Sequence, residues 1–113
     1  MTEIHKSGPV AVLTMQGKLV LGASSNEFRA TVEELLKTGN QLFVLNLKDV
    51  PYADSAGIGA LAYNFSNVKA AGGQIAVAEV QPAVRDVMEV TNLSSLIPMF
   101  ATEIEAVRSL SMN

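Results

Sequence analysis

The chain has 113 residues, 49% of them apolar and 5% aromatic, which suffices for one domain with a largely aliphatic core and is too little for two. It contains no cysteine, so a disulfide framework is excluded, and its net charge of −3 with scattered basic residues argues against nucleic-acid binding. The N-terminus lacks the layout of a signal peptide, and no apolar stretch approaches the roughly 20 residues of a membrane span. We therefore expect a single domain over residues 1–113, located in the cytoplasm.

The first elements predict an antiparallel hairpin. A short strand around residues 3–5 and a strand over residues 10–15 flank the turn Lys6-Ser7-Gly8-Pro9, and Gly17 ends the second strand.

A helix is predicted next. Ser24 and Glu27 have the spacing of a capping box, in which each side chain bonds the backbone N–H of the other residue. The helix runs to Lys37, and Gly39-Asn40 closes it. Its inner face carries Phe28, Val32, Leu35 and Leu36.

The apolar run over residues 42–47, broken by Asn46, stops at Lys48-Asp49. Such a run is typical of a strand buried on both faces, in the middle of a sheet that helices cover.

A loop with Pro51 follows, and Asp54 and Ser55 stand where the next helix begins. Both residue types are preferred N-caps, because their oxygens accept the free N–H groups of the first turn. We expect Ser55 to act as such a cap, with Asp54 facing the helix dipole. Small neighbours leave the hydroxyl accessible to another surface: Ala53, Ala56, Gly57 and Gly59.

The second helix extends to Gly72-Gly73, with a strand over residues 74–78 after it. Apolar residues spaced three and four apart form its predicted inner face: Ile58, Leu61, Phe65 and Val68.

Pro82 marks the first turn of a third helix with Val84, Val87 and Met88 inside, and the proline within residues 96–100 confines a last strand to an edge. Thr102 and Glu105 fit a second capping box, which opens a final helix over Ile104, Val107 and Leu110.

Helices and strands thus alternate after the hairpin, which implies parallel strands joined by helical crossovers. We predict an α/β fold: a mixed sheet of about five strands, with an N-terminal hairpin and four helices packed against it.

The layout and several motifs resemble the STAS domain, and more narrowly the bacterial anti-sigma factor antagonists, over nearly the whole chain. The motifs are Val44-Leu45-Asn46-Leu47, Val50, Asp54-Ser55-Ala56-Gly57-Ile58-Gly59 and Gly72-Gly73, together with Gly17-Lys18-Leu19 and Pro82-Ala83-Val84.

The resemblance implies a regulatory role. A domain of this kind binds an anti-sigma factor, usually a serine kinase of the histidine-kinase-like ATPase type, and so releases a sigma factor. The kinase phosphorylates a hydroxyl in the loop, the complex separates, and a phosphatase restores the antagonist. Carried onto this chain, the phosphoacceptor is Ser55, and the partner-binding residues are Tyr52, Ala53, Asp54, Ser55, Ala56, Gly57 and Gly59. We expect a monomer in the free state.

Two positions depart from the family pattern. Many members carry a second hydroxyl where this chain has Ala56, so Ser55 would be a single site. Members also often carry an acidic residue shortly after the second strand, where this chain has Val20-Leu21. The alternative is a constitutive STAS binding module in a transporter or stress-signalling assembly, without phosphorylation.

Other chemistry has little support. A serine nucleophile needs a base within hydrogen-bond reach, and the one histidine, His5, belongs to the opening strand. The glycines Gly57 and Gly59 lack the rest of a nucleotide-binding fingerprint, and His5 has no second histidine or cysteine with which to share a metal. We expect no catalysis, no cofactor and no metal.

Overall fold

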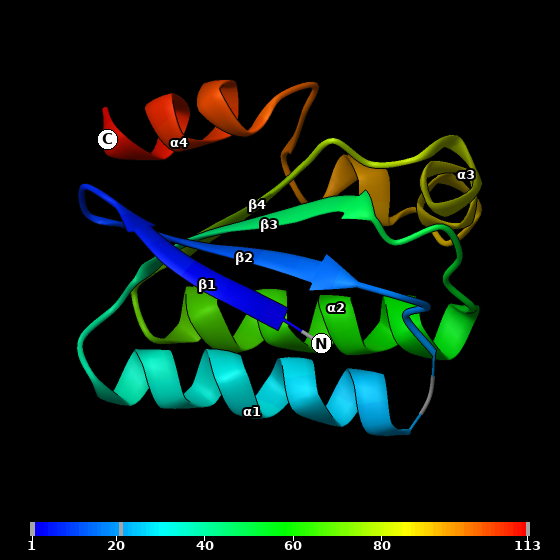
Figure 1. Cartoon of the computed structure of the whole chain (residues 1–113), viewed down its shortest axis with the longest axis horizontal. Coiled ribbons are helices and arrows are strands. Elements are labelled where there is room, and N and C mark those ends of the chain that lie inside the picture. The colour runs from blue at the N-terminus through cyan, green and yellow to red at the C-terminus, as the bar shows by residue number, and fades with distance from the viewer. Residues whose placement is uncertain (1, 21, 113) are drawn as a thin grey trace.

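The elements of the computed structural model, which describes residues 2–20 and 22–112, follow the predicted alternation (Figure 1). The strands are β1 (Thr2–Ser7), β2 (Val10–Gln16), β3 (Leu42–Asp49), β4 (Gln74–Ala78) and β5 (Met99–Phe100), and the α-helices are α1 (Ala23–Lys37), α2 (Ser55–Ala70), α3 (Pro82–Val90) and α4 (Glu103–Ser111). Among the described residues there is also one 3₁₀ turn, η1 (Leu93–Ser95), just before β5.

The strands form one sheet in the order β1-β2-β3-β4-β5. β1 is antiparallel to β2 across the two-residue loop Gly8-Pro9, and the other neighbouring strands are parallel. Gly8 has a φ of 59°, which a residue at the first position of a type II′ turn requires. The predicted mixed five-stranded sheet and its N-terminal hairpin are confirmed.

Helices cover both faces of the sheet, as Figure 1 shows, with α1 and α2 on one side and α4 on the other. The larger core lies under α1, α2 and α3, and the smaller core lies under α4. β3 contributes Phe43 and Leu45 to the larger core and Val44 to the smaller one, so the strand buried on both faces is confirmed.

The inner face of α2 differs from the prediction at one position. Ile58, Leu61 and Val68 are buried, whereas Phe65 is half-buried at the edge of the core. Asn64 takes the fully buried place instead, and its Nδ2 donates to the Ala60 carbonyl at 2.8 Å. The predicted inner face is therefore confirmed at three positions and wrong at Phe65.

The start of α1, the length of the last strand and one inner position of α4 also differ from the sequence-based expectation. α1 begins at Ala23 with Gly22 as its N-cap, so Ser24 lies inside the first turn, and its side chain is outside the described part of the structure. The last strand shortens to β5 at the edge of the sheet. The Thr102 cap of α4 is confirmed, with Thr102 Oγ1 accepting from the Glu105 N–H, but Ile104 is 69% exposed. Ala106, rather than Ile104, lies in the core.

Among the described residues, no helix is both long and apolar enough to cross a membrane.

Candidate functional site

The loop between β3 and α2 lies at the carboxyl ends of the parallel strands. Val50 is buried beyond the end of β3, and its N–H donates to the Leu47 carbonyl at 3.1 Å, which turns the chain toward Pro51. In open α/β sheets this end of the strands, where crossover loops meet, is the usual place of a binding site.

Backbone hydrogen bonds tie this loop to the segment that follows β2. The Leu19 N–H donates to the Tyr52 carbonyl at 2.9 Å, and the Leu19 carbonyl accepts from the Asp54 N–H at 3.2 Å. These bonds form an isolated parallel bridge between Leu19 and Ala53, and both side chains are buried. The loop is thus held as a short extension of the sheet.

Gly57 allows this contact. A Cβ atom at Gly57 would lie 2.0 Å from the Leu19 carbonyl oxygen, far inside van der Waals contact. The first turn of α2 therefore packs directly on the backbone of the Leu19 segment, and no larger residue fits without displacing one of them.

Asp54, not Ser55, caps α2. Asp54 has extended backbone angles, with φ −95° and ψ 176°, and its Oδ1 accepts from the Gly57 N–H at 2.7 Å. The helix itself begins at Ser55, as predicted, so the Ser55 side chain is exposed at the first helical position and makes no capping bond. The expectation that Ser55 is the cap was wrong, because the aspartate already holds the first-turn N–H.

The predicted binding residues divide into two groups. Tyr52, Ser55, Ala56 and Gly59 are exposed, Tyr52 by 49%, and Asp54 is partly exposed. Ala53 and Gly57 are buried, and their role is to shape the loop. The exposed group presents a hydroxyl and a tyrosine among very small side chains.

The one histidine lies elsewhere. His5 Nε2 is 3.4 Å from Glu103 Oε2 on the α4 face of the sheet, and this contact is an ion pair when the imidazole is protonated. No serine–histidine pair is assembled at Ser55. Within residues 2–20 and 22–112, no three of His, Cys, Asp and Glu come together in a way that could hold a metal ion.

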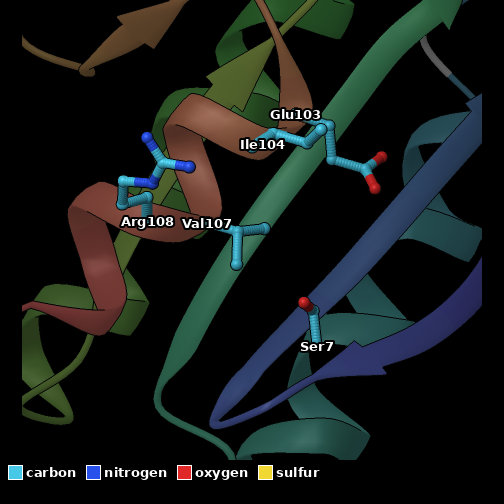
Figure 2. Close-up of a pocket in the computed structure, with 5 residues that line it drawn as sticks. All are labelled: Ser7, Glu103, Ile104, Val107 and Arg108. Atoms are coloured by element: carbon cyan, nitrogen blue, oxygen red, sulfur yellow. The ribbon is translucent and has the colours of Figure 1, made fainter.

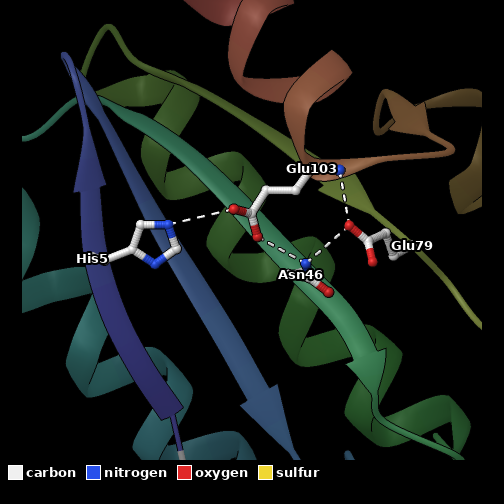
Figure 3. A network of polar contacts seen from close by, with 4 residues as sticks. All are labelled: His5, Asn46, Glu79 and Glu103. Carbon is white, nitrogen blue, oxygen red and sulfur yellow. Dashed lines mark hydrogen bonds and ion pairs between the residues drawn. The ribbon is translucent and has the colours of Figure 1, made fainter.

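A polar cluster that the sequence analysis did not identify lies around His5 (Figure 3). The Nδ2 of the buried Asn46 donates to Glu103 Oε1 at 2.8 Å and to Glu79 Oε2 at 3.3 Å, and its Oδ1 accepts from the Lys48 N–H at 2.9 Å. Glu79 Oε2 also accepts from the Glu103 N–H at 3.0 Å, at the start of α4. The signal in the sequence was the amide of Asn46 inside an apolar strand.

The comparisons with known proteins agree with the fold. The model of the STAS domain matches residues 1–106. The chain belongs to the STAS domain family. This STAS protein is 25% identical over 108 residues to an anti-sigma F factor antagonist of Paenibacillus polymyxa, across 96% of this chain and 92% of that protein.

Two solved structures show how widely the fold is used. The anti-sigma factor antagonist SpoIIAA in its unphosphorylated form matches with a TM-score of 0.84 and 21% identity, over 100% of this chain and 98% of that one. The murine anion transporter Slc26a9 matches with a TM-score of 0.75 and 23% identity, over 96% of this chain and 19% of the transporter chain. The recognition of a STAS fold from the sequence is confirmed.

Proposed function

We propose that this STAS protein is an anti-sigma factor antagonist, which binds an anti-sigma factor with serine kinase activity and thereby releases a sigma factor. It acts by binding in the cytoplasm and not by catalysis, and phosphorylation of Ser55 switches it off until a phosphatase restores it. One observation carries the proposal: the exposed Ser55 hydroxyl stands at the first position of α2, next to the Asp54 cap, after a loop that backbone hydrogen bonds tie to Leu19.

The partner surface is formed by the exposed residues of the loop and of the start of α2, as far as Gly59. Tyr52 supplies a large exposed side chain, of a residue type enriched at interaction hot spots. Ala56 and Gly59 are small and exposed, so a partner side chain can approach the helix backbone closely.

Phosphorylation would act on this surface through charge. A phosphate adds about −1.5 to −2 charges beside Asp54. In the free domain, the N-terminus of α2 tolerates that charge because the helix dipole is positive there. In a complex, an unpaired phosphate must be desolvated at a cost of several kcal/mol. Each loss of about 1.4 kcal/mol in binding free energy weakens the affinity tenfold. A complex of moderate affinity would separate without a large conformational change.

Phosphorylation of the purified protein by its cognate anti-sigma kinase tests the switch. With ATP, intact-mass spectrometry should show one added phosphate, which is absent in Ser55→Ala and retained in Ser66→Ala. Ser66 is the matched control because it is exposed on the same helix. Ser55→Ala should still bind the kinase, since Asp54 provides the cap. Ser55→Asp should bind more weakly, though it brings less charge than a phosphate.

Gly59→Arg tests the surface separately from the switch. No atom lies within 4 Å of a Cβ at Gly59, so the variant should fold, and its long side chain should abolish binding in calorimetry with the kinase. Ser66→Arg, with the same new side chain further along α2, should bind normally. Unchanged affinity of a folded Gly59→Arg variant would place the interface elsewhere.

The second candidate is a constitutive STAS binding module in a transporter or stress-signalling assembly. Val20 and Ala56 favour it, because they replace the acidic and hydroxyl residues that many antagonists carry. The likeness to a domain of a transporter chain is compatible with it. Equal affinity of the partner for the phosphorylated and unmodified proteins, or no phosphorylation at all, would favour this module.

A further inference from the structure

β1 (Thr2–Ser7) is the long free edge of the sheet. It has six residues, whereas the opposite edge strand β5 has two. Ser7 and Val10 face each other across the two-residue loop that joins β1 to β2. Hydrogen-bonded and non-hydrogen-bonded pairs alternate along an antiparallel ladder, so the backbone groups of every second β1 residue point away from β2. Thr2, Ile4 and Lys6 therefore offer N–H and C=O groups to a further strand.

A groove lies beside this edge on each face of the sheet. One groove, of about 310 Å³, lies between β1 and α1 and is lined by Ile4, Ala30, Thr31, Glu34 and Leu35. The other, of about 320 Å³, lies on the α4 face and is lined by Ser7, Glu103, Ile104, Val107 and Arg108 (Figure 2). Successive side chains of an added strand alternate between the two faces, so such a strand gains side-chain contacts on both.

We propose that the β1 edge is the interface of a symmetric dimer, in which β1 of a second copy pairs antiparallel with β1 of the first. This dimer replaces the monomer expected from the sequence. The sheet then continues across a two-fold axis perpendicular to it, as an isologous contact.

The symmetry restricts the register. The axis keeps each face on its own side, so paired residues must lie on the same face. Thr2 and Lys6 contact Glu27 and Asn40 on the α1 side, and Ile4 lines the groove there, whereas His5 contacts Glu103 on the α4 side. A register with Ile4 opposite Ile4 of the second copy meets this condition. It also pairs all the outward-facing residues of the two strands, which a register shifted by two residues does not.

The side chains are complementary to themselves in this register. Ile4 meets its own copy at the axis, and Glu3 lies opposite His5 of the second copy on both sides of it. Lys6 of the second copy lies opposite Thr2, whose hydroxyl donates to Glu27 Oε1 at 3.2 Å, so the ammonium meets a carboxylate. Charged residues on an edge strand usually discourage pairing, but here no like charges face each other: Glu3 faces an imidazole, and Lys6 faces a threonine beside a carboxylate.

The contact is a single strand pair, so its area is small and the dimer should depend on protein concentration. Neither Tyr52 nor Ser55 belongs to the edge or to its two grooves. The inference stands independently of the proposed function, and its test needs no partner protein.

Disulfide trapping tests the register directly, because the chain has no cysteine of its own. Opposite Cα atoms of a hydrogen-bonded antiparallel pair are about 5.5 Å apart, within the range of a disulfide. Ile4→Cys should form a covalent dimer under mild oxidation much faster than the control Val90→Cys, which exposes a thiol on α3, away from β1 and both grooves. Equal rates for the two variants would overturn the proposal.

Sedimentation velocity from micromolar to millimolar concentration tests the unmodified protein, which should shift from monomer to dimer. Ile4→Lys places like charges at the axis and should weaken association by about tenfold or more, whereas Val90→Lys on α3 should not. Both residues are substantially exposed, and circular dichroism verifies that both variants fold. A monomer over the whole range, or a dimer unaffected by Ile4→Lys, refutes the β1 interface.

Discussion

Gly57→Ala should be strongly destabilising, although it adds a single methyl group to a helix. The new Cβ would lie 2.0 Å from the Leu19 carbonyl oxygen and 2.6 Å from the carbonyl carbon, so the two segments must separate by about 1.4 Å to reach ordinary contact. That separation stretches the backbone bonds of Leu19 to Tyr52 and Asp54, now 2.9 and 3.2 Å long. Overpacking costs about 1–3 kcal/mol and each of the two weakened bonds about 0.5–1.5 kcal/mol, so we expect a loss of about 2–6 kcal/mol.

Urea unfolding measures this loss, and Gly59→Ala is its matched control. Gly59 lies on the same helix, is exposed and has no atom within 4 Å of its Cβ position. Alanine there should stabilise the protein by about 0.5–1 kcal/mol, because glycine is a poor helix former. The two substitutions should therefore have opposite signs. If Gly57→Ala unfolds within about 0.5 kcal/mol of the unmodified protein, the close contact with Leu19 does not exist.

Three further predictions concern stability and use the same unfolding assay. Asp54→Ala should lower the free energy of unfolding by about 0.5–2 kcal/mol because it removes the N-cap, whereas Ser55→Ala should change it by less than about 0.5 kcal/mol. A larger loss for Ser55→Ala than for Asp54→Ala would show that Ser55 is the cap. Phe65→Ala should cost about 1.5–3 kcal/mol, less than the 3–5 kcal/mol of a fully buried phenylalanine, since its ring is half-buried. Asn46→Leu should cost about 1–3 kcal/mol and increase hydrogen exchange in α4, because the Lys48 N–H loses its bond to Asn46 and the Glu79 and Glu103 carboxylates each lose a donor. Unchanged exchange would show that the cluster does not hold α4 in place.

The order of helices and strands could be predicted because it depends on local patterns. The continuous apolar run of β3 and the apolar spacing along α1 place these elements correctly. Turn residues mark several boundaries in the same local way, since Gly17, Gly39 and Gly72 all have positive φ.

Helix caps were harder to predict, because neighbouring residues compete for them. Asp54 and Ser55 are both good N-caps, and the extended backbone of Asp54, bonded to Leu19, decides between them. At α1 the N-cap is Gly22, two residues before Ser24, which the capping-box spacing had favoured. At α2 the side of the helix that meets the sheet is set by packing, so Asn64 is buried where the apolar spacing predicted Phe65.

The sequence by itself determined the STAS family, the order of the elements and the loop that carries Ser55, because each depends on residues close together in the chain. The tertiary structure alone decided which contacts join distant segments. It brought the Leu19 backbone against Gly57, gathered Asn46, Glu79 and Glu103 beneath α4, and left β1 as a free edge. These contacts depend on how the sheet orders its strands and on which face each helix covers, and no local pattern of residues encodes that arrangement.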